Sequence, residues 1–196
     1  MTRPTRAQTQ ERTRGHVLDV AHELFLRDGF GTTSLTRVAE TAGYSKGAVY
    51  SNFATKNDLC LAVLDRVRER QIDSLLTEVG SDPDFEIRLA GFARWAGRHI
   101  GDSSWTALEV EFATANRHDP EVRARLAARR RALTDALADF LTLQAEQCGV
   151  RLATPAAHAA LTVLGLGIGL GVQRAIDPDV PVAPLVDLLR HFLRPE

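Results

Sequence analysis

Cysteine is scarce in this chain, with only two among 196 residues. Cys60 and Cys148 lie far apart and neither belongs to a CxxC pair, so we expect no disulfide framework and no zinc site. No long apolar run follows the basic N-terminus, which argues against a cleaved export signal. Strand-like alternation of apolar and polar residues is also missing. These absences predict an all-α protein of the reducing cytoplasm, without metal or cofactor.

The composition is ordinary for a soluble globular protein, with 44% hydrophobic and 25% charged residues. The length fits one large domain or two small ones. The formal net charge is −1, yet residues 1–59 carry eight basic and six acidic side chains, which leaves an acidic remainder. The sign of this asymmetry suits an N-terminal region that faces DNA.

Apolar residues recur at helical spacing along most of the chain, and we expect about nine helices. The first runs from about Ala7 to Arg27 and ends at Asp28-Gly29, because glycine tolerates the left-handed helix cap. Its apolar stripe consists of Val17, Ala21, Leu24 and Phe25.

Capping side chains predict where later helices begin. Thr55 and Asp58 form a variant of the capping box, which opens a helix that runs to about Val79. Three further starts are predicted where a capping residue precedes a proline: Asp82-Pro83, Asp119-Pro120 and Thr154-Pro155.

Residues 33–53 contain the pattern that indicates function. A short amphipathic helix comes first, with an apolar face of Leu35, Val38, Ala39 and Ala42. Gly43 permits a sharp turn, and Ser45 caps a second short helix from Lys46 to about Phe53, which would bury Val49 and Phe53. Two short helices joined by a tight turn that contains glycine are typical of a helix-turn-helix. The second is about 12 Å long, so its N-terminal end fits a major groove about 12 Å wide.

Here the sequence resembles the TetR family of bacterial transcriptional regulators. The resemblance rests on Phe30-Gly31-Thr32-Thr33-Ser34, Val38-Ala39, Ala42-Gly43, Ser45-Lys46-Gly47, Tyr50, Phe53, Lys56 and Leu59, in family order and spacing. It implies a three-helix DNA-binding domain over residues 1–54. A larger helical domain for effector binding and dimerisation is implied over residues 55–196.

The resemblance also implies how the chain contacts a palindromic operator in double-stranded DNA. Phosphate contacts are implied for Thr33, Ser34, Tyr50, Asn52 and Lys56. Base-edge positions are implied for Tyr44, Ser45, Lys46 and Ala48, with Gly47 small enough for a close approach. Asn52 departs from the histidine common in the family but keeps a phosphate donor. Two plainer interpretations stay open: Tyr50 as a core aromatic, and Lys46 and Lys56 as solvated lysines.

Residues 152–173 carry no charged side chain, so a helix here must be buried on all sides. A membrane span is a rival by length. Thr154-Pro155, His158 and four glycines weaken that rival, and we expect no membrane partner. The resemblance implies instead a homodimer interface at about 155–176 and 182–194, whose two-fold axis would place two recognition helices about 34–36 Å apart.

The resemblance further implies a pocket for a small-molecule effector among the central helices. Its candidate residues are Phe92, Trp95, His99, Trp105, Leu108, Glu109 and Phe112, although core packing explains each aromatic equally well. The implied mechanism is a population shift, in which the effector favours a conformer with the wrong separation of recognition helices. The helix from Thr55 to about Val79 is implied to act as the lever.

The resulting interpretation is a cytoplasmic, homodimeric, ligand-responsive repressor that is not an enzyme. Two other classes stay open: a helical interaction module without DNA binding, and a small helical enzyme. The sequence has no HExxH motif and no paired metal-ligand spacing, which argues against a metal-dependent enzyme.

Overall fold

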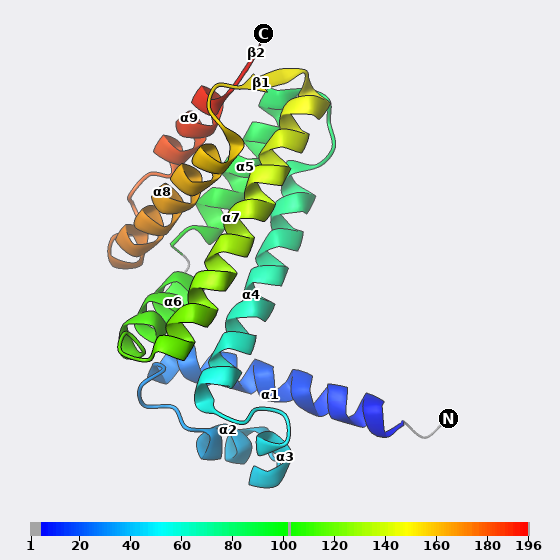
Figure 1. Ribbon diagram of the computed structural model, residues 1–196, viewed down its shortest axis with the longest axis vertical. Coiled ribbons are helices and arrows are strands. Elements are labelled where there is room, and N and C mark those ends of the chain that lie inside the picture. The colour runs from blue at the N-terminus through cyan, green and yellow to red at the C-terminus, as the bar shows by residue number, and fades with distance from the viewer. Residues whose placement is uncertain (1–4, 102, 196) are drawn as a thin grey trace. The chain divides into compact units, whose positions relative to one another are not determined.

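The computed structural model describes residues 5–101 and 103–195 (Figure 1). Within these residues the chain forms nine helices and two very short strands. The helices are α1 (Arg6–Asp28), α2 (Leu35–Ala42), α3 (Lys46–Tyr50), α4 (Lys56–Val79), α5 (Phe85–His99), α6 (Ser103–Ala115), α7 (Pro120–Cys148), α8 (Ala156–Ile176) and α9 (Ala183–Phe192). The predicted all-α class and the predicted number of helices are confirmed for this part of the chain.

The chain packs as two compact units. The N-terminal unit runs to Glu69 and also takes in Leu108–Arg117; the C-terminal unit consists of Arg70–Ala107 and the chain from His118 onward. Two helices, α4 and α6, therefore run from one unit into the other. The packing boundary differs from residue 54, which we expected to end the DNA-binding domain on functional grounds.

Capping side chains fix several helix starts as predicted. The Asp58 amide donates to Thr55 Oγ1 at 3.0 Å and the Thr55 amide donates to Asp58 Oδ2 at 3.1 Å, which completes the capping box of α4. Asp119 accepts from the first amides of α7, with Pro120 in the first turn. At α1, Gly29 ends the helix with φ +84° and donates to Phe25 O.

Three predicted termini are wrong. Helix α5 begins at Phe85 and is capped by Asp84, because the carboxylate of Asp82 instead accepts from the Asp84 amide. Helix α8 begins at Ala156 with Pro155 at the cap position and no capping side chain. Helix α3 ends at Tyr50 rather than near Phe53, since the chain turns directly afterwards.

The expectation of no strand also fails. Strands β1 (Val150–Leu152) and β2 (Leu193–Pro195) pair antiparallel, with Arg151 opposite Arg194. Each has three residues, too few for an alternating pattern to stand out in the sequence.

The N-terminal unit is built around the apolar stripe of α1. All four predicted residues, Val17, Ala21, Leu24 and Phe25, are buried. Helices α1, α2 and α3 pack on one another, as Figure 1 shows, and bury Val38, Ala39, Val49 and Phe53. The sequence placed these four residues on apolar, buried faces, and their burial confirms it.

The core of the C-terminal unit lies between α5, α7, α8 and α9. Helix α8 packs on α7 and α9 through residues such as Ala159, Ala160 and Val163. On its other side Leu161 is 62% exposed and Ile176 is 83% exposed. A single chain therefore buries only one side of α8, and the expected burial of its other side against a second subunit stays a prediction. Among the described residues α8 is the one helix long and apolar enough to cross a membrane, by length and composition alone.

Candidate nucleic-acid interface

The turn between α2 and α3 follows from two serine caps and one glycine. The Arg37 amide donates to Ser34 Oγ at 3.2 Å at the start of α2, and the Ala48 amide donates to Ser45 Oγ at 3.2 Å at the start of α3. Between them Gly43 adopts φ +73°, which a side chain would strain. The two helices consequently meet through a tight turn, as a helix-turn-helix requires.

Helix α3 buries one side chain and exposes the others. Val49 faces the core, while Ser45, Lys46 and Gly47 are exposed and Ala48 is half-buried. A Cβ added at Gly47 would meet no atom closer than Ser45 Oγ at 4.0 Å. The N-terminal end of α3 is thus an open surface of small residues with one positively charged side chain, Lys46. Base edges can approach such a surface closely.

The aromatic residues beside α3 occupy different environments. Tyr44, in the turn, packs edge-on against His16 with ring centroids 5.6 Å apart. Tyr50, at the end of α3, is 50% exposed. The interpretation of Tyr50 as a core aromatic is therefore wrong, and its hydroxyl is accessible to a phosphate oxygen.

Two other expected phosphate contacts, Asn52 and Lys56, already bond within the N-terminal unit. Asn52 Nδ2 donates to Ala48 O at 2.8 Å. Lys56 Nζ donates to Phe30 O at 2.9 Å and Gly31 O at 3.2 Å, and it lies 4.2 Å from the centroid of the Phe30 ring. Lys56 is thus not simply a solvated lysine, because two of its three donors hold the loop before α2.

Thr33 and Ser34 separate into an inner and an outer residue. Thr33 is 1% exposed, and its hydroxyl donates to Gly29 O at 2.9 Å. Ser34 is exposed, and only its oxygen is used, as the cap of α2. A phosphate at this helix start would therefore meet the Ser34 hydroxyl and backbone amides rather than the Thr33 side chain.

One salt bridge, between Arg37 and Asp28, joins α2 to the end of α1, and Arg27 of α1 pairs with the same carboxylate. Asp28 Oδ2 lies 2.9 Å from Arg37 Nη2 and 2.9 Å from Arg27 Nη2. The hydrogen bond from Arg27, together with the charges of Arg27 and Arg37, holds the pKa of Asp28 below its ordinary value. This pairing reinforces the packing that orients α2.

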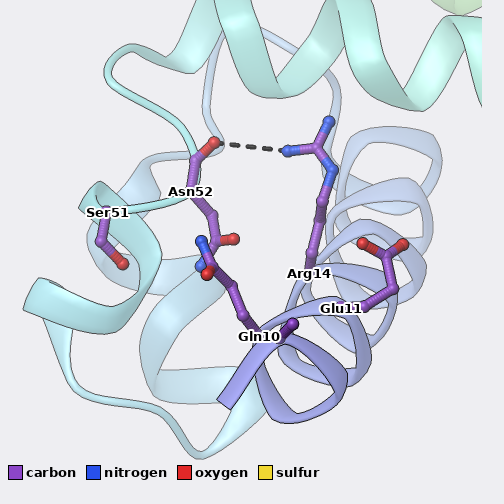
Figure 2. Close-up of a pocket in the computed structure, with 6 residues that line it drawn as sticks. Gln10, Glu11, Arg14, Ser51 and Asn52 are labelled. Atoms are coloured by element: carbon purple, nitrogen blue, oxygen red, sulfur yellow. Dashed lines mark hydrogen bonds between the residues drawn. The ribbon is translucent and has the colours of Figure 1, made fainter. Parts of the chain in front are cut away.

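A hollow of about 330 Å³ lies between the start of α1 and the turn after α3 (Figure 2). It is lined by Ala7, Gln10, Glu11, Arg14, Ser51 and Asn52. Arg14 Nη1 donates to Asn52 O at 3.3 Å, and its guanidinium lies 4.5 Å from the centroid of the Phe53 ring. Sequence reasoning missed Arg14, because no local pattern links it to residues 38 positions away.

The residues expected to line an effector pocket divide between the two units. Phe92, Trp95 and His99 stack along α5 in the C-terminal unit, with Trp95 and His99 ring centroids 5.3 Å apart. Trp95 Nε1 is buried with no hydrogen-bond partner among the described residues. Leu108 and Phe112 are buried in the N-terminal unit, to which Glu109 also belongs. The side chain of Trp105 lies outside the described residues.

The structure places Cys60 in an environment that disfavours its thiolate. Burial raises the pKa of the Cys60 thiol, since the thiolate would lose its hydration. Among the described residues no group of three or more His, Cys, Asp or Glu side chains is placed to hold a metal ion.

Comparison with known proteins gives a family match over residues 17–63, which fit the description "Bacterial regulatory proteins, tetR family". HTH-type transcriptional regulator AcrR of Shigella flexneri is 48% identical over 59 residues, which make up 30% of this chain. That match spans about a quarter of the relative's length, or 27%.

Solved structures resemble almost the whole chain. The reduced form of E. coli NemR aligns with 94% of this chain and 99% of its own, with a TM-score of 0.72 and 19% identity. A SmeT–triclosan complex aligns with 93% of this chain and 92% of its own, with a TM-score of 0.68 and 18% identity. At these identities the likeness shows a common fold.

Proposed function

The chain belongs to the TetR family of bacterial regulatory proteins, and on this premise we propose that it is a ligand-responsive repressor of transcription. The observation that carries the proposal is the exposed N-terminal end of α3, where small residues and Lys46 are presented by a capped helix-turn-helix. The matched family and the relative named above are regulators rather than enzymes. Cytoplasmic localisation follows for a protein that acts on DNA in a bacterium.

Base recognition is assigned to the open end of α3. Lys46 offers ammonium donors to guanine O6 and N7, and Tyr44, Ser45 and Ala48 flank it. Gly47 lets the helix approach the bases closely. Phosphate contacts are assigned to Ser34, Tyr50 and the backbone at Thr33, which set the register on the duplex without reading its sequence.

Asn52 and Lys56 retain a more limited phosphate role. The amide oxygen of Asn52 cannot donate, and one of the two N–H groups of its Nδ2 already donates to Ala48 O, which leaves one N–H for a phosphate. Lys56 has one remaining N–H for a phosphate beside the two that hold Phe30 O and Gly31 O. We expect Lys56 to contribute charge to the interface and order to the loop.

A homodimer is proposed to form through α8 and α9. The exposed apolar side chains of α8, Leu161 and Ile176 among them, supply a surface that one chain leaves uncovered. A two-fold axis at this surface would present two α3 helices to one palindromic operator, with half-sites one DNA turn apart, about 34–36 Å.

An effector is proposed to act by population shift. A coupling of about 1–3 kcal/mol between effector and operator would weaken DNA binding about 5- to 150-fold. The proposed pocket uses the aromatic row of α5 in the C-terminal unit, namely Phe92, Trp95 and His99. Effector contacts at Trp105, Leu108, Glu109 and Phe112 stay predictions from the resemblance. That SmeT was solved with triclosan supports a small-molecule effector. Helices α4 and α6 both run between the two units, so either can carry the change.

The test is selection of bound duplexes from a random DNA pool by the full-length protein, followed by titration of the selected duplex and a shuffled duplex at several salt concentrations. We expect a palindromic consensus and an affinity that falls linearly on a log–log plot against salt. A sequence-blind response without salt dependence would instead support a helical interaction module. Turnover of an added metabolite by the purified protein would support an enzyme.

A further inference from the structure

A short stretch of α6 packs with the helix-turn-helix although it lies far away in the sequence. Residues 108–117 belong to the N-terminal unit. Phe112, fully buried, meets the Phe30 ring edge-on with centroids 4.9 Å apart. The next contact is polar: the Gly31 amide donates to Glu111 Oε1 at 3.0 Å across 80 residues of sequence. Both contacts fall on the loop between α1 and α2.

This loop is held from two sides. Glu111 of α6 accepts from the amide of Gly31, and Lys56 of α4 donates to the carbonyl of the same residue at 3.2 Å. A Cβ added at Gly29 would lie only 3.1 Å from Glu111 Oε1, so the carboxylate also lies against the backbone of that residue. The backbone from Gly29 to Gly31 is therefore fixed by two charged side chains on different helices.

The position of the loop determines where α2 begins. Three residues after Gly31 stands Ser34, the cap of α2, and α2 packs directly on α3. Base-edge hydrogen bonds depend strongly on distance and angle, so a small displacement of α3 weakens them more than it weakens phosphate contacts. Charge-assisted hydrogen bonds are stronger than neutral ones, which favours the carboxylate as the anchor.

We propose that Glu111 is a positioning residue for DNA binding: by accepting from the Gly31 amide, it fixes the loop that starts α2 and hence the orientation of α3. The inference rests on the proposed DNA-binding function. It adds to that function a residue outside the segment of the family match, which ends at residue 63. It also gives residues 108–117 a part in DNA recognition beside their proposed place near the effector.

The test compares full-length Glu111→Ala and Glu111→Gln with the wild type on a selected operator and on a shuffled duplex. Glu111→Ala removes the acceptor, and we expect operator affinity to fall by about three- to tenfold with a smaller loss on the shuffled duplex. Glu111→Gln keeps an acceptor oxygen and should restore most of the operator affinity. The backbone amide signal of Gly31 in NMR spectra should move in Glu111→Ala and stay near its wild-type position in Glu111→Gln.

Two controls separate positioning from loss of fold. Val110→Ala changes a neighbouring exposed residue of α6 and should leave binding unchanged. Val63→Ala weakens the buried core of α4 without touching the loop; it should lower thermal stability and leave the ratio of operator to shuffled affinity intact.

Each outcome decides the question. A wild-type protein without any preferred duplex would refute the proposed function itself, before any variant is examined. If the wild type has an operator and Glu111→Ala binds it equally well, the positioning role is overturned. Equal losses on both duplexes would overturn it too, since they indicate a smaller folded fraction. So would a complete lack of rescue by Glu111→Gln, because the glutamine oxygen can still accept from the Gly31 amide.

Discussion

Lys46 and Lys56 carry the same charge in the same motif, but their surroundings differ. Lys46 is exposed at the first position of α3. Lys56 is half-buried and holds two backbone carbonyls of the loop before α2. Replacement of either lysine removes one positive charge, yet only replacement of Lys56 also leaves Phe30 O and Gly31 O without this donor.

Lys46→Ala should therefore change specificity and leave stability alone. We expect discrimination at one base pair of each half-site to fall by about 1–3 kcal/mol, because the ammonium no longer meets the guanine acceptors. The thermal midpoint should stay within error of the wild type. Binding of a set of single-base operator variants measures the first effect; an unchanged preference at every position would contradict the assignment.

Lys56→Ala serves as the matched variant. We expect it to weaken both duplexes with a salt slope smaller by about one, and to weaken the operator more than the shuffled duplex, because the loop before α2 loses one of its two charged anchors. It should also lower the free energy of unfolding by about 1–2 kcal/mol, since Phe30 O and Gly31 O lose a charged donor. Chemical denaturation together with the salt series tests both parts; a full-stability variant would show that the two carbonyl contacts contribute nothing.

Two glycines of α5 provide a test at the scale of the element. A Cβ at Gly91 would meet the backbone of Glu78 and lie 3.1 Å from Val79 Cα, at the end of α4. A Cβ at Gly97 would meet nothing within 4 Å. Gly91→Ala should lower the free energy of unfolding by about 1–3 kcal/mol through overpacking. Gly97→Ala should raise it by about 0.5–1 kcal/mol, because alanine is the better helix former. Chemical denaturation of the two variants under the same conditions measures both changes in the free energy of unfolding. A Gly91→Ala protein as stable as the wild type would refute the close approach of α4 and α5.

The contact between α5 and α9 should depend on pH. Arg190 Nη2 lies 2.9 Å from Glu86 Oε2, and this hydrogen bond holds the pKa of Glu86 below its ordinary value. A carboxyl group whose pKa is lowered in the folded state stabilises that state at pH values above its ordinary pKa of about 4.3. This contribution is lost as the pH falls through the lowered pKa. The difference in the free energy of unfolding between the wild type and Arg190→Gln should thus be present near pH 7 and vanish in acid. A difference that stays constant down to pH 3 would exclude this ion pair as its source.

Local chemistry allowed most elements to be predicted, and long-range contacts account for what was missed. Ser45, Thr55 and Asp119 cap their helices through neighbours in the sequence, so the printed residues suffice. Asp82 failed as a cap because a second aspartate two residues later takes that place. The hydrogen bonds of Lys56 and Glu111 to Gly31, and of Arg14 to Asn52, join residues that no local pattern connects. The helix caps of the candidate interface were predictable, whereas the network that orients its helices was not.

For the whole molecule, the exposed side of α8 gives the sharpest test of assembly. Leu161→Glu places a charge on the surface that we propose is buried between two chains, so the variant should be monomeric and bind the operator poorly. Ile87→Glu makes the same change on α5, where the side chain is 52% exposed, and should leave the assembly unchanged. Sedimentation analysis of both variants decides the matter; a dimeric Leu161→Glu protein would place the interface elsewhere.

The contribution of α6 to the N-terminal unit has a consequence for anyone who builds chimeric regulators from this chain. An exchange of the first 54 or 69 residues onto a foreign body would leave Phe30 without Phe112 and the Gly31 amide without its acceptor. A transplant that retains specificity should carry Leu108–Arg117 along with the N-terminal residues, as a discontinuous module of two grafted pieces.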